Sequence, residues 1–282
     1  MAAGKLIHQQ YGKAKVRVLK VIRQGARHDI KEVEVAVALQ GDFDTSYTHG
    51  DNSQVVPTDT MKNIVNGLAQ DHLGDELETF ALTLAKHFLA NYPQVTRASV
   101  DVLQQSWRRM QIDGQAHAHS FTGGDSGKLF ARAQASRDSV EVEAGIEELL
   151  ILKLTGSGFE GYPKDAFTTL PETSDRILAT KMKATWAYQN VPANYTQSNE
   201  RILAAMLKVF AVNYSPSVQT TLYQMAEAAL ETAPEISQVT LVLPNQHCLL
   251  VNLKPFGREN KNEIFVPTTE PHGLIEATVR RV

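Results

Sequence analysis

The sequence of 282 residues predicts an α+β fold made of two copies of one unit, in which antiparallel strands carry helices on one face. Three observations predict this fold. A succession of helix, proline and strand occurs twice. Several segments alternate between apolar and polar residues, as strands with one buried face do. Two other segments carry an apolar stripe at helical spacing.

The repeat is centred on Pro93 and Pro234, which lie half a chain length apart. The segments that begin with them, PQVTRASVDV and PEISQVTLVL, place apolar side chains at the same positions. Before each proline, apolar residues recur at spacings of three and four: Leu77, Phe80, Ala81, Leu84 and Phe88 in the first copy, and Val218, Leu222, Met225 and Ala229 in the second. Because proline cannot continue a helix, each copy is expected to pass there into a strand. We therefore expect two units, residues 1–138 and 139–282.

Strict alternation predicts further strands over residues 33–39, 140–146 and 182–188. Each of these strands would have one dry and one wet face, which suits antiparallel sheets. Each unit is then expected to contain a β-hairpin, helical segments and a second pair of strands.

Two triplets are expected to begin helices. Thr58-Asp59-Thr60 precedes an apolar pattern of helical spacing, and Ser174-Asp175-Arg176 precedes Ile177 and Leu178. A short oxygen-bearing side chain at such a position can cap the free N–H groups of the first turn. Capping explains both triplets, although a helix N-terminus also favours an anionic ligand.

Composition excludes several classes of protein. A net charge of −3 gives no general electrostatic reason to bind nucleic acid or an anionic membrane. No apolar run approaches the roughly 18–20 residues of a membrane span. Cys248 is the only cysteine, which excludes an intrachain disulfide and a cysteine-based metal cluster. The N-terminus lacks the apolar core of a signal peptide, and the chain ends Arg280-Arg281-Val282 rather than in a Ser-Lys-Leu peroxisomal signal. We therefore expect a cytoplasmic protein.

Some local patterns have an ordinary structural interpretation. The stretch from Gly123 to Lys128 is one residue short of a phosphate-binding loop and lacks its hydroxyl residue, so a hairpin loop is expected. His117 and His119 could share a strand face, but no third metal ligand stands near them in sequence, and no metal site is expected. Cys248 lies in an apolar run and is expected to be buried.

Three residues stand at expected strand ends, where loops commonly carry function. Lys13 follows Tyr11-Gly12 just before the first strand, Phe159 follows the flexible Gly156-Ser-Gly158, and His247 follows Leu243-Pro-Asn-Gln246, where a strand is expected to be interrupted.

These three residues lie in stretches that resemble the urate oxidase (uricase) family in its bacterial form, and the resemblance extends over nearly the whole length of the sequence. The most specific match is Lys153-Leu-Thr-Gly-Ser-Gly-Phe159-Glu-Gly-Tyr162, followed by Phe167, Leu170 and Arg176 at fixed spacing. The other matching stretches include Tyr11-Gly12-Lys13, Thr58-Asp59, Trp107-x-Arg109, His119-Ser-Phe121, Ser217-Val218-Gln219, Leu243-Pro244-Asn245-x-His247 and Gly273-Leu274-Ile275. Leu154 and Pro57 depart from the family, which carries a small or hydroxyl residue and commonly alanine there. Neither departure removes a chemical group.

The resemblance implies the tunnelling fold (T-fold). In this fold each subunit holds two homologous units, each an antiparallel sheet with helices on one face. The units form barrels, and a homotetramer surrounds a central tunnel with its active sites between subunits. The implied activity is the oxidation of urate by O2 to 5-hydroxyisourate with release of H2O2 in purine degradation. It needs no metal or cofactor.

The resemblance also implies the residues that bind the substrate. Phe159 would stack on the flat ring of urate. Arg176 and Gln219 would bind its polar edge, since a planar guanidinium and an amide complement a purine-like anion. The backbone near Val218 and Asp59 would add polar contacts. Thr58 and Asp59 would reach in from a neighbouring subunit, so that the ligand lies between this helix start and the expected helix start at Arg176.

Catalytic roles follow from the same resemblance. Thr58 and Asn245 resemble the small polar hole that holds water or O2 over the urate ring. Lys13, Thr58 and His247 resemble a proton relay, which would remove protons from urate and make it electron-rich enough to reduce O2 itself.

Two alternatives stay open. A related T-fold hydrolase acting on a pterin or purine would want a Cys/His metal set or a glutamate that anchors the heterocycle, whereas this sequence offers Arg176, Gln219 and one cysteine. A purine-binding protein that has lost catalysis would keep the binding residues but break the relay, whose three members are all present.

Overall fold

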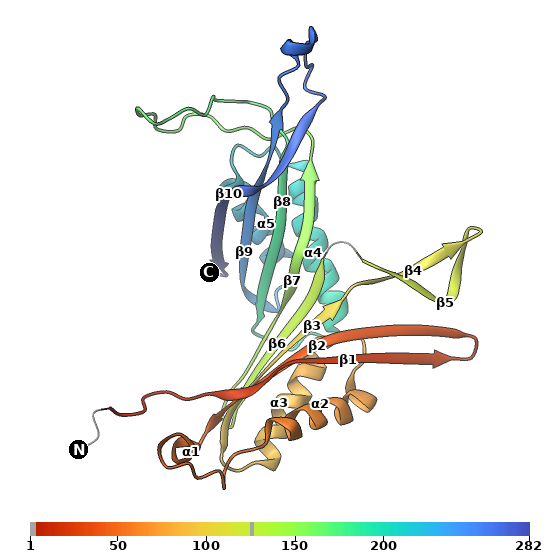
Figure 1. Ribbon diagram of the computed structural model, residues 1–282, viewed down its shortest axis with the longest axis vertical. Helices are drawn as coiled ribbons and strands as arrows, with labels where there is room; N and C mark the ends of the chain where they lie inside the picture. Colours follow the sequence, from red (N-terminus) through yellow and green to blue (C-terminus); the bar gives the residue numbers. More distant parts are fainter. Residues whose placement is uncertain (1–3, 125–126) are drawn as a thin grey trace. The chain divides into compact units, whose positions relative to one another are not determined.

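The computed structural model describes residues 4–124 and 127–282 and confirms the α+β class predicted from the sequence (Figure 1). The chain divides into two compact units. The first extends to Gly145 and includes Ala187–Thr196, and the second comprises Ile146–Trp186 and Gln197–Val282. The domain boundary expected between residues 138 and 139 stays a prediction.

The first unit begins with an antiparallel hairpin of β1 (Tyr11–Gln24) and β2 (Arg27–Gly41). Three helices follow: α1 (Asp44–Thr48), α2 (Thr58–His72) and α3 (Leu77–Asn91). Strands β3 (Val95–Gln105) and β6 (Lys128–Ser136) complete the order β1-β2-β3-β6, and β4 (Trp107–Ile112) pairs with β5 (Gln115–Gly123) as a separate ribbon. The core lies between α2, α3 and one face of this sheet, where Val35, Val37, Phe80 and Leu84 are almost fully buried.

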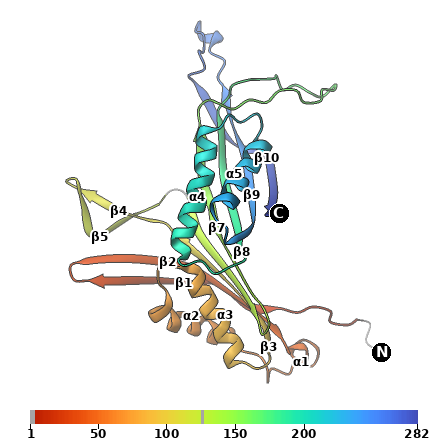
Figure 2. The ribbon, with the colours of Figure 1, turned by 180° about the vertical axis from the view of Figure 1, so that it is seen from behind.

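The second half of the chain repeats this order of strands, helices and strands, although the first residues of β7, the end of β8 and the start of α4 fall in the first unit. Strands β7 (Val140–Lys153) and β8 (Leu178–Tyr188) precede helices α4 (Tyr195–Val212) and α5 (Val218–Thr232), and β9 (Ile236–Leu250) and β10 (Phe265–Arg280) follow. A short 3-10 turn, η1 (Lys254–Phe256), connects the last two strands. The strand order is β7-β8-β9-β10, and the helices lie on one face of these strands (Figure 2).

The predicted helix–proline–strand repeat is confirmed. α3 and α5 are both 15 residues long, and each is followed, after its proline, by a strand, β3 from Val95 and β9 from Ile236. The apolar positions that matched in sequence are the buried positions of both strands: Val95, Ala98, Val100 and Val102 in β3, and Ile236, Val239, Leu241 and Leu243 in β9.

Both expectations about helix starts need correction. Ser174-Asp175-Arg176 begins no helix, because Leu178 is already the first residue of β8, where Leu178, Ala179 and Thr180 are all buried. Thr58 does begin α2, but Pro57 occupies the capping position and no side chain caps this helix. The ligand can therefore not lie between two equivalent helix starts at Thr58 and Arg176.

Of two smaller expectations, one is wrong and the other stays a prediction. Cys248 is only half-buried, because β9 leaves the core at this point and Leu249 and Leu250 are exposed. The loop expected between Gly123 and Lys128 connects β5 to β6, but its residues 125–126 lie outside the described residues. Within residues 4–124 and 127–282, none of the helices has the length and hydropathy required to cross a membrane.

Candidate functional site

The nine expected site residues fall into two groups, one in each unit. Lys13, Thr58 and Asp59 belong to the first unit. The second unit holds Phe159, Arg176, Val218, Gln219, Asn245 and His247. Each group is built by elements of its own unit.

Lys13 sits on a part of β1 with an unusual backbone. A Cβ atom on Gly12 would lie 1.8 Å from the carbonyl oxygen of Val37, so only glycine permits this approach of β1 to β2. The pairing register then shifts between Lys13 and Val16, and Lys15 adopts a left-handed φ of 58°. This β-bulge interrupts the regular pairing between Lys13 and Val16, and bulges commonly redirect a functional side chain.

Thr58 and Asp59 form the first turn of α2. The Asp59 carboxylate accepts hydrogen bonds from Lys62 and from Asn63 Nδ2, the latter at 3.0 Å. The hydrogen bond from Lys62 lowers the pKa of Asp59 most, and the charge of Lys13 acts in the same direction. Lys13 and the start of α2 therefore share one electrostatic environment.

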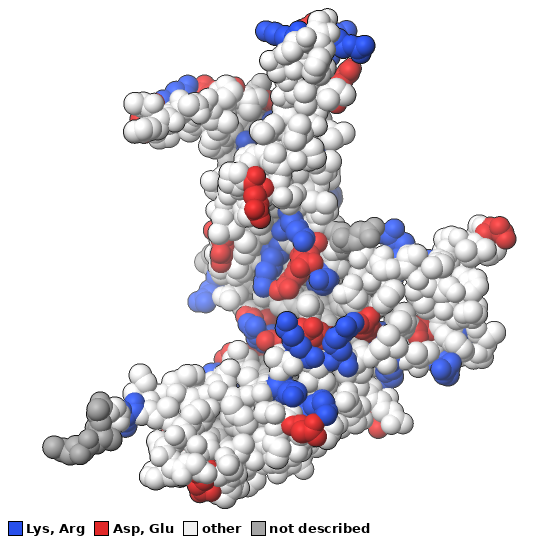
Figure 3. Space-filling model, viewed as in Figure 1, with Lys and Arg blue, Asp and Glu red and all other residues white. Residues whose placement is uncertain are grey.

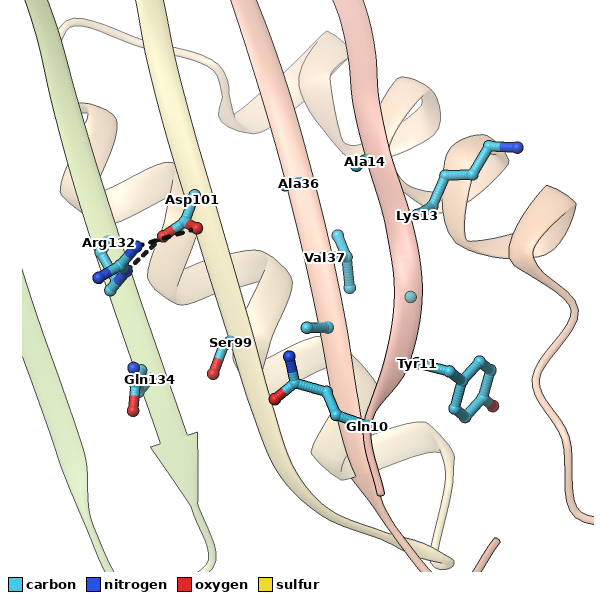
Figure 4. Close-up of a pocket in the computed structure, with 12 residues that line it drawn as sticks. Gln10, Tyr11, Lys13, Ala14, Ala36, Val37, Ser99, Asp101, Arg132 and Gln134 are labelled. Atoms are coloured by element: carbon cyan, nitrogen blue, oxygen red, sulfur yellow. Dashed lines mark hydrogen bonds and ion pairs between the residues drawn. The ribbon is translucent and has the colours of Figure 1, made fainter. Parts of the chain in front are cut away.

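A cavity of about 480 Å3 adjoins this group. It lies over the opposite face of the sheet, where Ser99, Asp101, Arg132 and Gln134 line it. Figure 4 shows the side chains of Tyr11 and Lys13 pointing away from these four residues. Arg132 is paired with Asp101 in this cavity, and Figure 3 shows positive and negative side chains intermixed on the visible surface. Lys13 also lines the cavity, so its lining combines the Arg132–Asp101 ion pair with one member of the expected relay.

The second group is built on the loop that connects β7 to β8. Ser157 lies beside Ser215 in a short parallel bridge, in which Gly158 N donates to Ser215 O and Ser215 N donates to Gly156 O, both at 2.8 Å. Phe159 and Thr173 exchange two backbone hydrogen bonds, and Arg176 N donates to Ser157 O at 2.7 Å. The backbone thus brings Phe159, Arg176 and the start of α5 into one place.

Asp175 closes this loop. Its carboxylate accepts hydrogen bonds from the Thr155 hydroxyl at 2.9 Å and from Gly156 N at 2.8 Å. These two bonds, the one from Thr155 first, lower the pKa of Asp175. The Asp175 carboxylate thus accepts its hydrogen bonds from residues of the loop. Among the residues that the structure describes, it forms no ion pair with the neighbouring Arg176.

Arg176 presents an unpaired guanidinium. Its Nε atom is buried and has no hydrogen-bond partner among the residues that the structure describes. Burial lowers the pKa of Arg176, although a guanidinium stays protonated in proteins. The guanidinium carbon lies 5.4 Å from the centre of the Phe159 ring, which also stacks on Tyr162 at 4.8 Å. A buried donor without a partner beside an aromatic ring can accommodate a flat anion.

The start of α5 completes the donors of this group. Ser217 caps the helix by accepting a hydrogen bond from Thr220 N at 3.1 Å. Val218 is buried, whereas the Gln219 side chain is exposed. The first N–H groups of a helix have no partner within it and can bind an anion. The Ser217 cap was readable from the sequence as a hydroxyl residue before an apolar stripe, but only the Thr58 and Ser174 triplets were interpreted as caps.

Asn245 and His247 lie on β9, which runs without interruption through Leu250. The expected break in this strand is wrong, because the irregularity lies in its pairing with β10. Asn245 is opposite Gly273 and His247 is opposite Thr268, with a register shift between these two pairs. Thr268 Oγ1 donates to His247 O at 3.1 Å. Both site residues are half-buried at this bulge.

Comparison with known proteins identifies the family to which these two groups of residues belong. The family model for uricase matches residues 9–130 and 142–276, which together cover most of the chain. The chain belongs to the uricase family. It is 43% identical over 272 residues to the uricase of Arthrobacter globiformis, covering 96% of this chain and 88% of that relative. It is 40% identical over 280 residues to the uricase of Dictyostelium discoideum, covering 98% and 97% of the two chains.

Solved uricase structures agree with the fold. The crystal structure of uricase from Arthrobacter globiformis has a TM-score of 0.93 at 42% identity and covers 99% of this chain and 96% of that chain. The uricase from Bacillus fastidious has a TM-score of 0.83 at 25% identity and covers 97% and 94%. The T-fold class implied by the family resemblance is thereby confirmed.

Proposed function

We propose that the protein is a urate oxidase, which oxidises urate with O2 and water to 5-hydroxyisourate and H2O2. The observation that carries this proposal is the unpaired, half-buried guanidinium of Arg176 beside the Phe159 ring, in a chain of the uricase family. A planar, nitrogen-rich anion satisfies both groups at once, because its edge accepts the guanidinium hydrogen bonds while its face stacks on the aromatic ring.

The second unit would bind the substrate. Arg176 donates to one edge of urate, and the Gln219 amide donates to and accepts from the other. The backbone N–H of Val218, in the first turn of α5, adds a donor. Asn245, on β9, would hold water or O2 over the ring face opposite Phe159.

The first unit would supply proton transfer. Lys13 and Thr58 act with His247 as a relay that removes protons from urate. The dianion then gives two electrons to O2, which takes up two protons to become H2O2, and water adds to the oxidised ring to give 5-hydroxyisourate. Because the substrate itself is the reductant, the proposed chemistry assigns no residue of the chain to a metal or an organic cofactor.

The two groups would meet between subunits of a homotetramer. Thr58 and Asp59 of one subunit would then complete the site that Phe159 and Arg176 of another subunit begin. This arrangement predicts that an isolated monomer is inactive. The division of each chain into homologous units, 1–138 and 139–282, and a cytoplasmic location belong to the same proposal.

One experiment separates this function from the alternatives. Metal-stripped protein is mixed with urate in air, and the ultraviolet band of urate is followed together with peroxide. Loss of the band with stoichiometric peroxide supports the oxidase. Tight urate binding without turnover would support a binding protein that has lost catalysis, and an activity on pterins or purines that returns only with zinc would support the hydrolase.

A further inference from the structure

Tyr11 makes a two-point contact with the loop that leads into α2. Its hydroxyl accepts a hydrogen bond from Val56 N at 2.8 Å and donates one to Val56 O at 3.3 Å. Its ring packs edge-on against Phe43, with 4.8 Å between ring centres and 86° between ring planes. Phe43 is fully buried and Val56 is 2% exposed, so both partners are rigidly held.

This contact joins the two relay residues of the first unit. Tyr11 lies two residues before Lys13, and side chains two apart on a strand project from the same face, as Figure 4 shows for this pair. Val56 lies two residues before Thr58 and is connected to it through Pro57, whose ring restricts the backbone. A displacement of Tyr11 from Val56 would therefore change the position of Thr58 relative to Lys13.

The backbone on both sides of Lys13 is constrained or irregular, so the Tyr11 side chain is the part that determines how β1 contacts the loop before α2. On one side Gly12 approaches the Val37 carbonyl so closely that a Cβ atom would not fit, and on the other side the bulge interrupts the pairing between Lys13 and Val16. Burial raises the pKa of the Tyr11 hydroxyl, which therefore stays protonated and keeps both hydrogen bonds at neutral pH.

We propose that Tyr11 is a positioning residue for the proton relay, because it holds Val56 and thereby fixes Thr58 with respect to Lys13. The inference rests on the proposed urate oxidase function and deepens it. Tyr11 touches neither substrate nor O2 in this proposal, and its effect on turnover passes through Lys13 and Thr58.

The first test is Tyr11→Phe, which keeps the ring on Phe43 and removes both hydrogen bonds to Val56. We expect kcat to fall on the order of 10- to 100-fold, since small displacements of reacting groups cost up to about that much. The KM for urate should stay within about twofold, because Phe159, Arg176 and Gln219, which would hold the urate ring, belong to the other unit. The matched control is Tyr47→Phe, which removes a hydroxyl whose contact, 3.4 Å to Gln10 O, does not involve Val56; its kcat should stay at the wild-type value.

A double-mutant cycle separates positioning from a general structural role. If Tyr11 acts through Lys13, then Tyr11→Phe should lower kcat severalfold less in a Lys13→Met background than in the wild type. An equal loss in both backgrounds would overturn the inference. Pro57→Gly provides a second route, because it loosens the link between Val56 and Thr58 while leaving Tyr11 intact, and it should also lower kcat without raising KM.

The outcomes distinguish this inference from the function on which it rests. A wild-type protein that does not consume urate refutes the proposed function, and with it the relay. A wild-type protein that produces peroxide from urate, together with Tyr11→Phe and Pro57→Gly variants of unchanged kcat, refutes the positioning role alone.

Discussion

The guanidinium carbon of Arg176 lies 5.4 Å from the centre of the Phe159 ring, although the two residues are 17 positions apart along the chain. The backbone explains the contact. Arg176 N donates to Ser157 O, and Phe159 pairs with Thr173, so the loop between them is closed at its base. A cation over an aromatic ring, with its Nε buried and unpaired, is an incomplete arrangement that a planar anion would complete.

Replacing Arg176 with lysine should weaken urate binding more than it slows turnover. Lysine keeps the charge but loses the planar fork, and hydrogen bonds to charged groups contribute about 1.5–3 kcal/mol each. We expect the KM for urate to rise by roughly one to two orders of magnitude, measured from the loss of the urate band. The control is Arg201→Lys. It changes an arginine of α4 that forms an ion pair with Glu235. A KM unchanged by Arg176→Lys would remove Arg176 from the binding site.

Periodicity was sufficient to predict much of this fold but not its connections. The apolar stripes before Pro93 and Pro234 identified α3 and α5, because each stripe keeps the helical spacing over several turns and each is followed by an alternating strand. Ser174–Arg176 was assigned to a helix because the short apolar pair Ile177 and Leu178 fits either period. In the structure these residues lead into β8, which is stabilised by pairing with neighbouring strands. Such pairing cannot be inferred from the sequence of one segment alone.

The site residues became apparent through the family motifs, whereas the residues that position them did not. Asp175 accepts from Thr155 and Gly156, and Tyr11 holds Val56, across chain separations that no local pattern encodes. The interruption expected before His247 followed from Pro244, but Pro244 lies within β9 opposite Leu274. The irregular pairing falls after it, between Asn245 and His247.

Asp175→Asn should loosen the loop that carries Arg176, with an effect that depends on pH. Hydrogen bonds lower the pKa of Asp175 in the folded protein, so its stabilisation is present above the unfolded-state pKa and is lost as the pH falls through the lower folded-state value. We expect the variant to have a lower Tm than the wild type at pH 7. This difference should shrink as the pH falls below about 4, the ordinary pKa of aspartate. A Tm difference that is constant from pH 7 to pH 3 would contradict the assignment.

Lys13→Met should separate proton transfer from binding. Methionine has a similar length but accepts no proton, and loss of a general acid or base costs on the order of 10²–10⁴ in rate. We expect kcat to fall by that factor, while urate still binds with nearly the wild-type affinity in equilibrium titration without O2. Lys86→Met, an exposed lysine on α3 of the same unit, serves as the control and should retain full activity. Normal turnover of Lys13→Met would exclude Lys13 from the relay.

Gly158→Ala should disturb the site through the backbone, whereas Gly67→Ala should not. A Cβ atom on Gly158 would lie 2.2 Å from the Tyr214 hydroxyl and 3.0 Å from Thr173 O. Thr173 belongs to the segment that leads to Arg176, and Tyr214, from the connection between α4 and α5, donates its hydroxyl to Ser174 O of that segment at 3.0 Å. The added methyl group must displace the Tyr214 hydroxyl and crowd the backbone of Thr173 and Ser174, and such overpacking costs typically about 1–3 kcal/mol.

Gly67 provides the matched comparison because it lies within α2, where a Cβ atom would meet only open space within 4 Å. Alanine at this helical position should stabilise the protein by about 1 kcal/mol. Urea unfolding and urate KM are measured for both variants. We expect Gly158→Ala to lower the unfolding midpoint and raise KM, and Gly67→Ala to raise the midpoint with KM unchanged. Equal KM values in the two variants would show that the approach of the two loop segments at Gly158 does not set the geometry between Phe159 and Arg176.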